Sequence, residues 1–254
     1  MRAPCSLLVT TAAAYGDHRC QAVDVFVPDG CHEMPTVLCL AGGWWAGDAR
    51  LRARALAMDL AERGWPAAAL GLRPLDEVGD GHDLVDDVVA AALRAVEEAT
   101  VLGAHARVCS LIGGGSGSLL ALLAGHRLQA EDLLRPRCLV GAGVTPTISP
   151  WDDCDPAIAE RLRRFAPAAE ADLDPLRLDP AHFPPVLHVH GDTDPAIPAR
   201  LARELHRLLR AAERPSQLTL LAGLGHDMLD DPTSLAARNA LRPIIAWLGQ
   251  RDYL

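Results

Sequence analysis

Short apolar segments alternate with amphipathic ones along most of this chain, and this alternation constrains the fold more than any other feature. The apolar segments are short and often β-branched, as strands buried on both faces of a sheet are. The predicted strands are residues 22–27, 36–40, 67–70, 108–112, 138–141, 186–190 and 218–221, and the predicted helices between them are 51–63, 84–98, 118–126, 198–212 and 234–249. This order predicts the α/β class, with a mostly parallel central sheet flanked by helices.

Two parts of the chain depart from the alternation. Segment 22–27 is followed closely by 36–40, which predicts an antiparallel start of the sheet. Between Gly143 and Pro185 the sequence predicts one short helix, 156–165, and a stretch rich in Pro and Asp instead of a strand. We therefore expect a single domain over residues 1–254 with a small helical lid inserted at about 144–183, although a surface excursion without a role fits the same residues.

Composition excludes several classes of function. Half of the residues are apolar, which allows a sizeable core, and the formal net charge is −9. All 24 basic residues are arginines, so no lysine is present for Schiff-base chemistry. The acidic balance predicts no nucleic acid and no membrane surface as partner, and no apolar run reaches the roughly 18 residues of a spanning helix. Seven cysteines without a C-x-x-C motif are typical of reduced thiols, so a cytoplasmic location is expected.

A glycine-rich turn joins the predicted strand 108–112 to the next helix. It reads L-I-G-G-G-S-G-S-L-L from residue 111 to 120. A sharp strand-to-helix turn can present a serine as a nucleophile when small residues stand two places before and after it. With Ser116 at the centre the pattern is G-G-S-G-S, in which Ser118 replaces the final glycine of G-x-S-x-G. A phosphate-binding loop is the alternative, but the G-K-[ST] ending is missing.

A base and an acid follow two later strands. Segment 186–190 runs into Asp192 and Asp194, and segment 218–221 runs into His226. Side chains just past the carboxyl ends of parallel strands meet at one edge of a sheet. The order Ser, Asp, His along the chain is that of a serine nucleophile with its orienting acid and general base on this architecture.

These motifs make the chain resemble the α/β-hydrolase superfamily, in particular its esterase/lipase and arylformamidase-like branch. The opening Y-G-D-H-R-C-Q-A-V-D-V-F-V-P (15–28) and the later P-P-V-L-H-V-H-G-D-T-D-P-A-I-P (184–198) are similar to family segments. The resemblance implies Ser116 as nucleophile, His226 as base and Asp194 as the orienting acid, with Asp192 as a turn former.

The resemblance also implies an oxyanion hole. L-A-G-G-W-W-A-G-D (40–48) resembles the H-G-G-x-W loop of the family. Backbone N–H groups of Gly43, Trp44 and Gly117 would then stabilise the oxyanion of an acyl transfer.

This loop departs from the family at Ala41, where the family has a histidine that braces the turn. Ala41 can make no side-chain hydrogen bond, so we expect a turn that is less firmly held. Either packing of Trp44 and Trp45 holds it, or a bulky aromatic substrate completes it on binding, and the paired tryptophans favour the second. Trp45 and Trp151 are the candidate substrate-binding side chains, with core packing as the alternative.

The motif H-V-H-G-D-T-D (188–194) also has the composition of a metal site, because His188 and His190 lie on one face of a strand. The hydrolase interpretation explains the same residues, so we expect neither metal nor cofactor. The predicted function is hydrolysis of a carboxylic ester or related acyl bond of a small acyl or aryl substrate through a Ser-His-Asp triad and an acyl-enzyme. A cyclase or acyltransferase with the same triad, and a non-catalytic binding protein on the same fold, remain open. A homodimer is compatible with the sequence.

Overall fold

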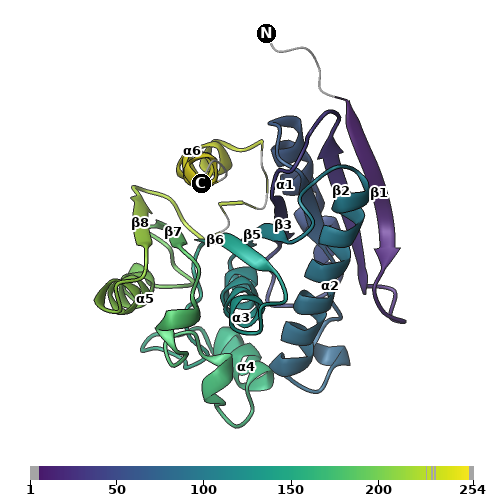
Figure 1. The fold of residues 1–254 in the computed structure, drawn as a ribbon. Coiled ribbons are helices and arrows are strands. Elements are labelled where there is room, and N and C mark those ends of the chain that lie inside the picture. The colour runs from purple at the N-terminus through teal and green to yellow at the C-terminus, as the bar shows by residue number, and fades with distance from the viewer. Residues whose placement is uncertain (1–5, 227, 230, 232, 252–254) are drawn as a thin grey trace.

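Eight strands form one mixed, mostly parallel sheet in the order β1-β2-β4-β3-β5-β6-β7-β8 (Figure 1). The structure is a computed structural model that describes residues 6–251 except 227, 230 and 232. The strands are β1 (Leu7–Ala14), β2 (Ala22–Pro28), β3 (Thr36–Leu40), β4 (Ala67–Leu70), β5 (Val108–Gly114), β6 (Arg135–Ala142), β7 (Val186–Gly191) and β8 (Ser216–Leu221). Strands β2 to β5 are buried at every position, which is why they are mostly apolar; Asp24, Thr36 and Ser110 are the buried polar exceptions.

The antiparallel part of the sheet differs from the expectation. A strand that the sequence analysis missed, β1, pairs antiparallel with β2. The other neighbour of β2 is β4, also antiparallel, and not β3. The reason is that β4, reached through the first helix, takes the place between β2 and β3. At the edge of the sheet β1 is largely exposed, and its buried and exposed positions alternate only weakly. Its sequence therefore lacks the apolar pattern by which the other strands were predicted.

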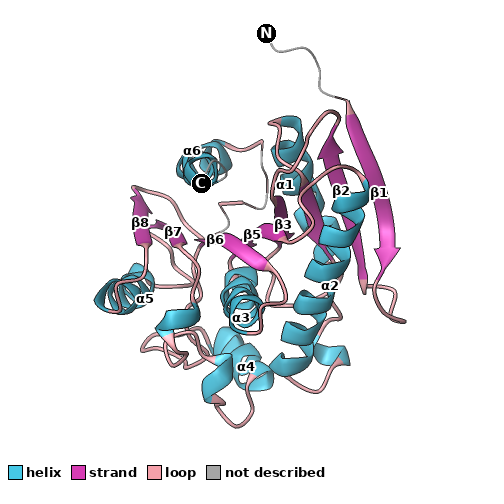
Figure 2. Cartoon of the chain, viewed as in Figure 1, coloured by secondary structure: helices cyan, strands magenta, loops and turns pink. Residues whose placement is uncertain are grey.

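Helices cover both faces of the sheet (Figure 2). Their bounds are α1 (Ala49–Glu62), α2 (Gly81–Val101), α3 (Ser116–Ala130), α4 (Pro156–Phe165), α5 (Ala199–Ala211) and α6 (Leu235–Arg251), with short 3₁₀ helices η1 (Leu75–Glu77), η2 (Ala171–Leu173) and η3 (Pro180–His182). One apolar core joins the sheet to α1 and α6, and the other joins it to α2, α3 and α5. In the described part of the chain no helix is both long and apolar enough to span a membrane.

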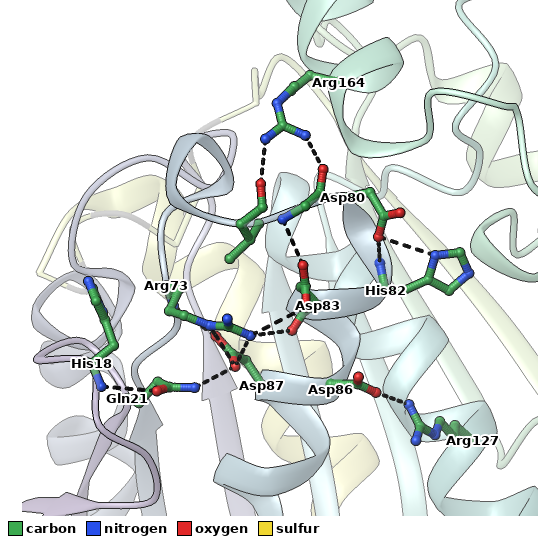
Figure 3. A network of polar contacts seen from close by, with 12 residues as sticks. His18, Gln21, Arg73, Asp80, His82, Asp83, Asp86, Asp87, Arg127 and Arg164 are labelled. Carbon is green, nitrogen blue, oxygen red and sulfur yellow. Dashed lines mark hydrogen bonds and ion pairs between the residues drawn. The ribbon is translucent and has the colours of Figure 1, made fainter.

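The helix predicted over 156–165 has these bounds in the structure, as α4. Asp155 caps its first turn and Pro156 occupies the first helical position, where its missing N–H costs nothing. From the last turn of α4, Arg164 donates to the backbone carbonyls of Val78 and Gly79, between η1 and α2 (Figure 3). These bonds join the segment between β6 and β7 to the segment that follows β4.

The start of α2 is held by acidic side chains, as Figure 3 also shows. Asp87 is almost fully buried and accepts hydrogen bonds from the Arg73 guanidinium and from Gln21 Nε2 at 2.8 Å. A buried carboxylate needs such compensation, because desolvation without partners is costly. The network ties α2 to the segment after β4 and to the turn before β2.

His188 on β7 predicts an acid sensitivity of the fold. Its side chain is fully buried, and neither ring nitrogen has a hydrogen-bond partner among the residues that the structure describes. Burial, with smaller contributions from His206 and His190, lowers the pKa of His188 to about 3. The native state therefore keeps His188 neutral, whereas the unfolded chain protonates it below its ordinary pKa of about 6.5. This contribution to stability is present above pH 6.5 and is lost progressively as the pH falls toward 3.

We expect the free energy of unfolding of the natural chain to fall more steeply between pH 7 and pH 5 than that of His188→Leu, by about 2 kcal/mol over this interval. Urea unfolding at the two pH values measures it. His32→Leu is the control, because His32 is exposed and its substitution should leave the pH dependence as it is. An equal change in the free energy of unfolding between the two pH values for the natural chain and His188→Leu would show that His188 does not cause the acid sensitivity.

Candidate active site

The turn between β5 and α3 is centred on Gly115. β5 ends at Gly114 and α3 begins at Ser116. Gly115 between them has φ 48° and ψ −126°, a conformation open almost only to glycine. The sequence analysis placed Ser116 at this strained position, and the structure corrects it by one residue.

Gly113 and Gly117 also indicate that Gly115 is the centre of the turn. A Cβ at Gly113 would lie 2.4 Å from the carbonyl oxygen of Gly117, and a Cβ at Gly117 would lie 2.5 Å from that of Ala41. Such contacts with backbone atoms exclude any side chain. The small residues two before and two after the turn residue are therefore Gly113 and Gly117, and the full pattern G-x-G-x-G replaces the imperfect one centred on Ser116.

Ser116 is the first residue of α3, and its side chain faces the oxyanion loop predicted from the sequence. Its hydroxyl accepts a hydrogen bond from the Trp44 N–H at 2.8 Å, and its carbonyl accepts one from Trp45 Nε1 at 3.2 Å. The residue is only 1% exposed. This position gives Ser116 a role in joining α3 to the loop, and it does not support the predicted role as nucleophile.

Asp194 and His226 meet as the sequence predicted. His226 Nδ1 lies 2.9 Å from Asp194 Oδ2. The other carboxylate oxygen accepts from the N–H groups of Ala196 and Ile197, both at 2.9 Å. Burial raises the pKa of Asp194, but hydrogen bonds from His190, His226 and the Ile197 N–H outweigh it and hold the pKa below its ordinary range. Asp194 is therefore ionised and accepts the Nδ1 proton of His226, so that Nε2 is the acceptor nitrogen of the neutral imidazole.

His190 is a member of this site that the sequence analysis considered only as a metal ligand. Its Nδ1 accepts from the Val144 N–H at 3.0 Å, so the ring proton is on Nε2. His190 Nε2 lies 2.8 Å from the Ile197 carbonyl oxygen and 3.3 Å from Asp194 Oδ2. The signal was present in the spacing, because residues at 190 and 194 lie on either side of the turn that ends β7. Among the described residues no group of three or more His, Cys, Asp or Glu could hold a metal ion.

The oxyanion loop carries three consecutive residues in the left-handed region, Gly43 at φ 89°, Trp44 at 51° and Trp45 at 59°. This conformation is costly for tryptophan and persists only where its surroundings impose it. The N–H of Trp44 is directed at the Ser116 hydroxyl. The N–H that follows the turn residue belongs to Ser116, at the first helical position, where amides have no intrahelical partner. Because the centre of the turn is Gly115 and not Ser116, the N–H of Ser116 takes the position that was predicted for the N–H of Gly117.

The loop is braced, although Ala41 supplies no side-chain bond. Arg161 of α4 donates to the Trp44 carbonyl from Nε at 3.1 Å and from a terminal nitrogen at 2.7 Å. It also forms an ion pair with Asp76 at 2.6 Å. Arg52 of α1 donates to the Gly42 carbonyl at 3.1 Å. The expectation of a weakly held turn is therefore wrong, because Arg161 of α4, distant in sequence, and Arg52 of the helix that follows the loop supply the brace.

The two tryptophans predicted to bind substrate are packed in the core. Trp45 is 4% exposed and stacks on Phe165 of α4, with ring centroids 4.4 Å apart. Trp151 is 9% exposed and belongs to the core on the side of α2, α3 and α5. The packing alternative accounts for both residues.

A small cavity of about 90 Å³ lies where these elements meet. It is lined by the 42–44 segment, Gly115, Ala142, His226 and Leu229. A second cavity of about 290 Å³ shares Leu229 with it and is lined by Ala41, by Gly114 and by apolar side chains of α1 that include Leu56. Alanine in place of the family histidine leaves a short side chain on the wall of this second space.

The strand order, the sharp turn after β5, and the acid and histidine after β7 and β8 define the α/β-hydrolase fold. No family model matches the chain. A distant relative by sequence is esterase LipC of Mycobacterium tuberculosis, 26% identical over 241 residues. The match covers 85% of this chain but 59% of LipC, so the chain spans about three fifths of that relative's length.

Solved structures of esterases share the fold. Esterase B from Lactobacillus rhamnosis superposes with a TM-score of 0.83 at 18% identity, covering 99% of this chain and 88% of the other. A truncated carbohydrate esterase from gut microbiota gives 0.78 at 17% identity, covering 100% and 99%. A thermostable esterase from Pseudomonas putida gives 0.80 at 19% identity, covering 99% and 84%.

Proposed function

We propose that this protein hydrolyses a carboxylic ester or a related acyl bond in the cavity beside His226. The observation that carries the proposal is the pair of His226 and Asp194, joined at 2.9 Å, with Nε2 of the histidine beside the turn at Gly115. A neutral imidazole whose proton is held on Nδ1 by a carboxylate is a general base. The similarity to esterases in fold and distant sequence supports the same reaction class.

Backbone amides are the candidates for stabilising charge on the substrate carbonyl. In the predicted mechanism Gly43, Trp44 and Gly117 donate; after the correction at Gly115, the N–H groups of Gly43 and Ser116 are the better candidates. Preorganised amides of this kind are worth on the order of 2.7–4 kcal/mol each in the transition state. The predicted acyl-enzyme on Ser116 has the weaker support, since the Ser116 hydroxyl is directed at the Trp44 N–H.

The substrate class follows from the size and lining of the site. The cavity at His226 holds about 90 Å³, and the adjoining space is largely apolar. A short acyl chain fits these dimensions better than the bulky aromatic substrate favoured from the sequence, because Trp45 is engaged in packing and the loop is already braced. Small-molecule acyl esters are therefore the proposed substrates.

Hydrolysis of p-nitrophenyl esters from acetate to octanoate tests the proposal. We expect turnover that declines with acyl length and that falls at least a hundredfold in His226→Ala, because the general base is lost. His32→Ala is the control, since His32 is exposed on the surface. Turnover in His226→Ala equal to the control would contradict the proposal.

A second candidate function is a binding protein for acyl compounds that performs no chemistry. Glycine at the turn residue favours it, because the fold then supplies no side-chain nucleophile there. In the same assay it predicts that no ester is turned over, while a hydrolysis product or an uncleavable analogue still binds. Nothing in the site favours acyl transfer or cyclisation over hydrolysis.

Arg161→Ala is expected to lower ester turnover roughly tenfold to a hundredfold, because the Trp44 carbonyl loses both of its donors and the loop amides are displaced. Arg163→Ala is the matched control: Arg163 lies on the same helix, is exposed and pairs with Glu160. Its turnover should stay within about twofold of the natural chain. Steady-state rates with p-nitrophenyl acetate measure both variants, and equal effects would show that Arg161 does not position the loop.

A further inference from the structure

We propose that a water molecule held beside Gly115, and not a side-chain hydroxyl, is the nucleophile of this site. The proposal rests on the hydrolysis proposed above and assigns its mechanism: the acyl group passes directly to water, and no acyl-enzyme forms.

Gly115 occupies the position at which a side-chain nucleophile of this protein would stand. A Cβ on this residue would lie 2.9 Å from His226 Nε2. Of the glycines and serines in the turn, residue 115 is the one with the strained conformation that presents a side chain at the strand-to-helix turn. A nucleophile that belonged to the protein would therefore stand at 115, where the chain has only hydrogen atoms on Cα.

Ser116 is already held by hydrogen bonds to the oxyanion loop. Its hydroxyl accepts the Trp44 N–H at 2.8 Å, its carbonyl accepts Trp45 Nε1, and the residue is 1% exposed. To attack a substrate it would have to leave a buried hydrogen bond that holds the oxyanion loop. Ser116 is therefore a positioning residue.

The cavity beside Gly115 is large enough for a water molecule. Gly115 and His226 both line the cavity of about 90 Å³, which exceeds the roughly 15 Å³ that one water needs. The polar wall of this cavity consists of the backbone of the 42–44 segment and the imidazole of His226. A water there can donate to His226 Nε2 and still face a carbonyl carbon bound in the cavity.

The step balances without a covalent intermediate on the protein. His226 Nε2 takes one proton from the water as its oxygen bonds to the carbonyl carbon, and the carbonyl oxygen becomes the oxyanion. The oxyanion then reforms the C=O bond and the bond to the leaving oxygen breaks. The proton held on Nε2 passes to that oxygen, so one ester and one water give one acid and one alcohol.

Covalent labelling separates the two mechanisms. We would treat the folded natural chain, Ser116→Ala, Gly115→Ser and Gly115→Ala with a fluorophosphonate probe and locate the label by peptide mapping. We expect no label on the natural chain or on Ser116→Ala. Gly115→Ser should acquire a label at residue 115, because its hydroxyl stands beside His226, and Gly115→Ala, which adds the Cβ without the hydroxyl, should not.

Turnover of p-nitrophenyl acetate gives an independent readout. Loss of a true nucleophile costs about 10⁶-fold in a serine hydrolase, whereas Ser116→Ala should lose at most about a hundredfold here, because it removes only one of the bonds that position the oxyanion loop. A label on Ser116 of the natural chain, together with a loss of several orders of magnitude in Ser116→Ala, would overturn the water mechanism and leave the hydrolase function standing. Absence of ester turnover in the natural chain would instead overturn the function itself. If Gly115→Ser does not fold, the comparison of the natural chain with Ser116→Ala decides.

Discussion

Asp194→Asn is expected to lower ester turnover by about 10⁴-fold, as removal of the orienting acid does in other sites of this kind. The carboxylate accepts from His226 Nδ1, from His190 and from two backbone N–H groups. An amide has one acceptor oxygen and an NH₂ group, so it cannot satisfy four donors, and it stabilises the wrong tautomer of His226. The general base would then carry its proton on the nitrogen that must accept one.

Asp192→Asn is the matched control from the same loop. Asp192 is exposed, and one of its carboxylate oxygens accepts from the Gly223 N–H at 2.7 Å, as a turn residue does. We expect its turnover to stay within tenfold of the natural chain. Rates with p-nitrophenyl acetate, taken on variants with matched thermal unfolding, give the comparison. A larger loss in Asp192→Asn than in Asp194→Asn would refute the choice of acid.

Gly117→Ala should destabilise the protein by about 3 kcal/mol, although alanine is the better helix former. Its Cβ would lie 2.5 Å from the Ala41 carbonyl oxygen and 2.7 Å from that of Leu40. Both are backbone atoms at the end of β3, so relief requires α3 to move away from the sheet. The same displacement would carry Ser116 away from Trp44, and activity should fall with stability.

Gly249→Ala, in α6, is expected to change the free energy of unfolding in the opposite direction. A Cβ there meets nothing within 4 Å, so the substitution should stabilise the protein by up to about 1 kcal/mol through helix propensity alone. Urea unfolding of the two variants and the natural chain measures both effects. Destabilisation of equal size in both would mean that the close approach of α3 to β3 is not what requires glycine at 117.

Most of the framework could be predicted from local pattern. The seven predicted strands and six predicted helices all occur in the structure, because buried parallel strands and amphipathic helices leave strong periodic signals. Strand β1 was missed, since an edge strand with exposed Leu8 and Val9 lacks that signal. Asp194 and His226 could be predicted as partners because both follow strands, and strands that run parallel deliver such residues to one edge of the sheet.

The sequence by itself determined the α/β architecture, the acid–histidine pair and the place of the sharp turn. It did not determine which residue occupies the centre of that turn, because six small residues in a row, 113–118, fit two registers of the same five-residue motif. Tertiary structure decided for Gly115, since the contacts that exclude side chains at 113 and 117 come from α3 itself and from the end of β3. The brace of the oxyanion loop was equally out of reach, because Arg161 lies 117 residues from the Trp44 carbonyl it holds, and no local pattern links two positions so far apart.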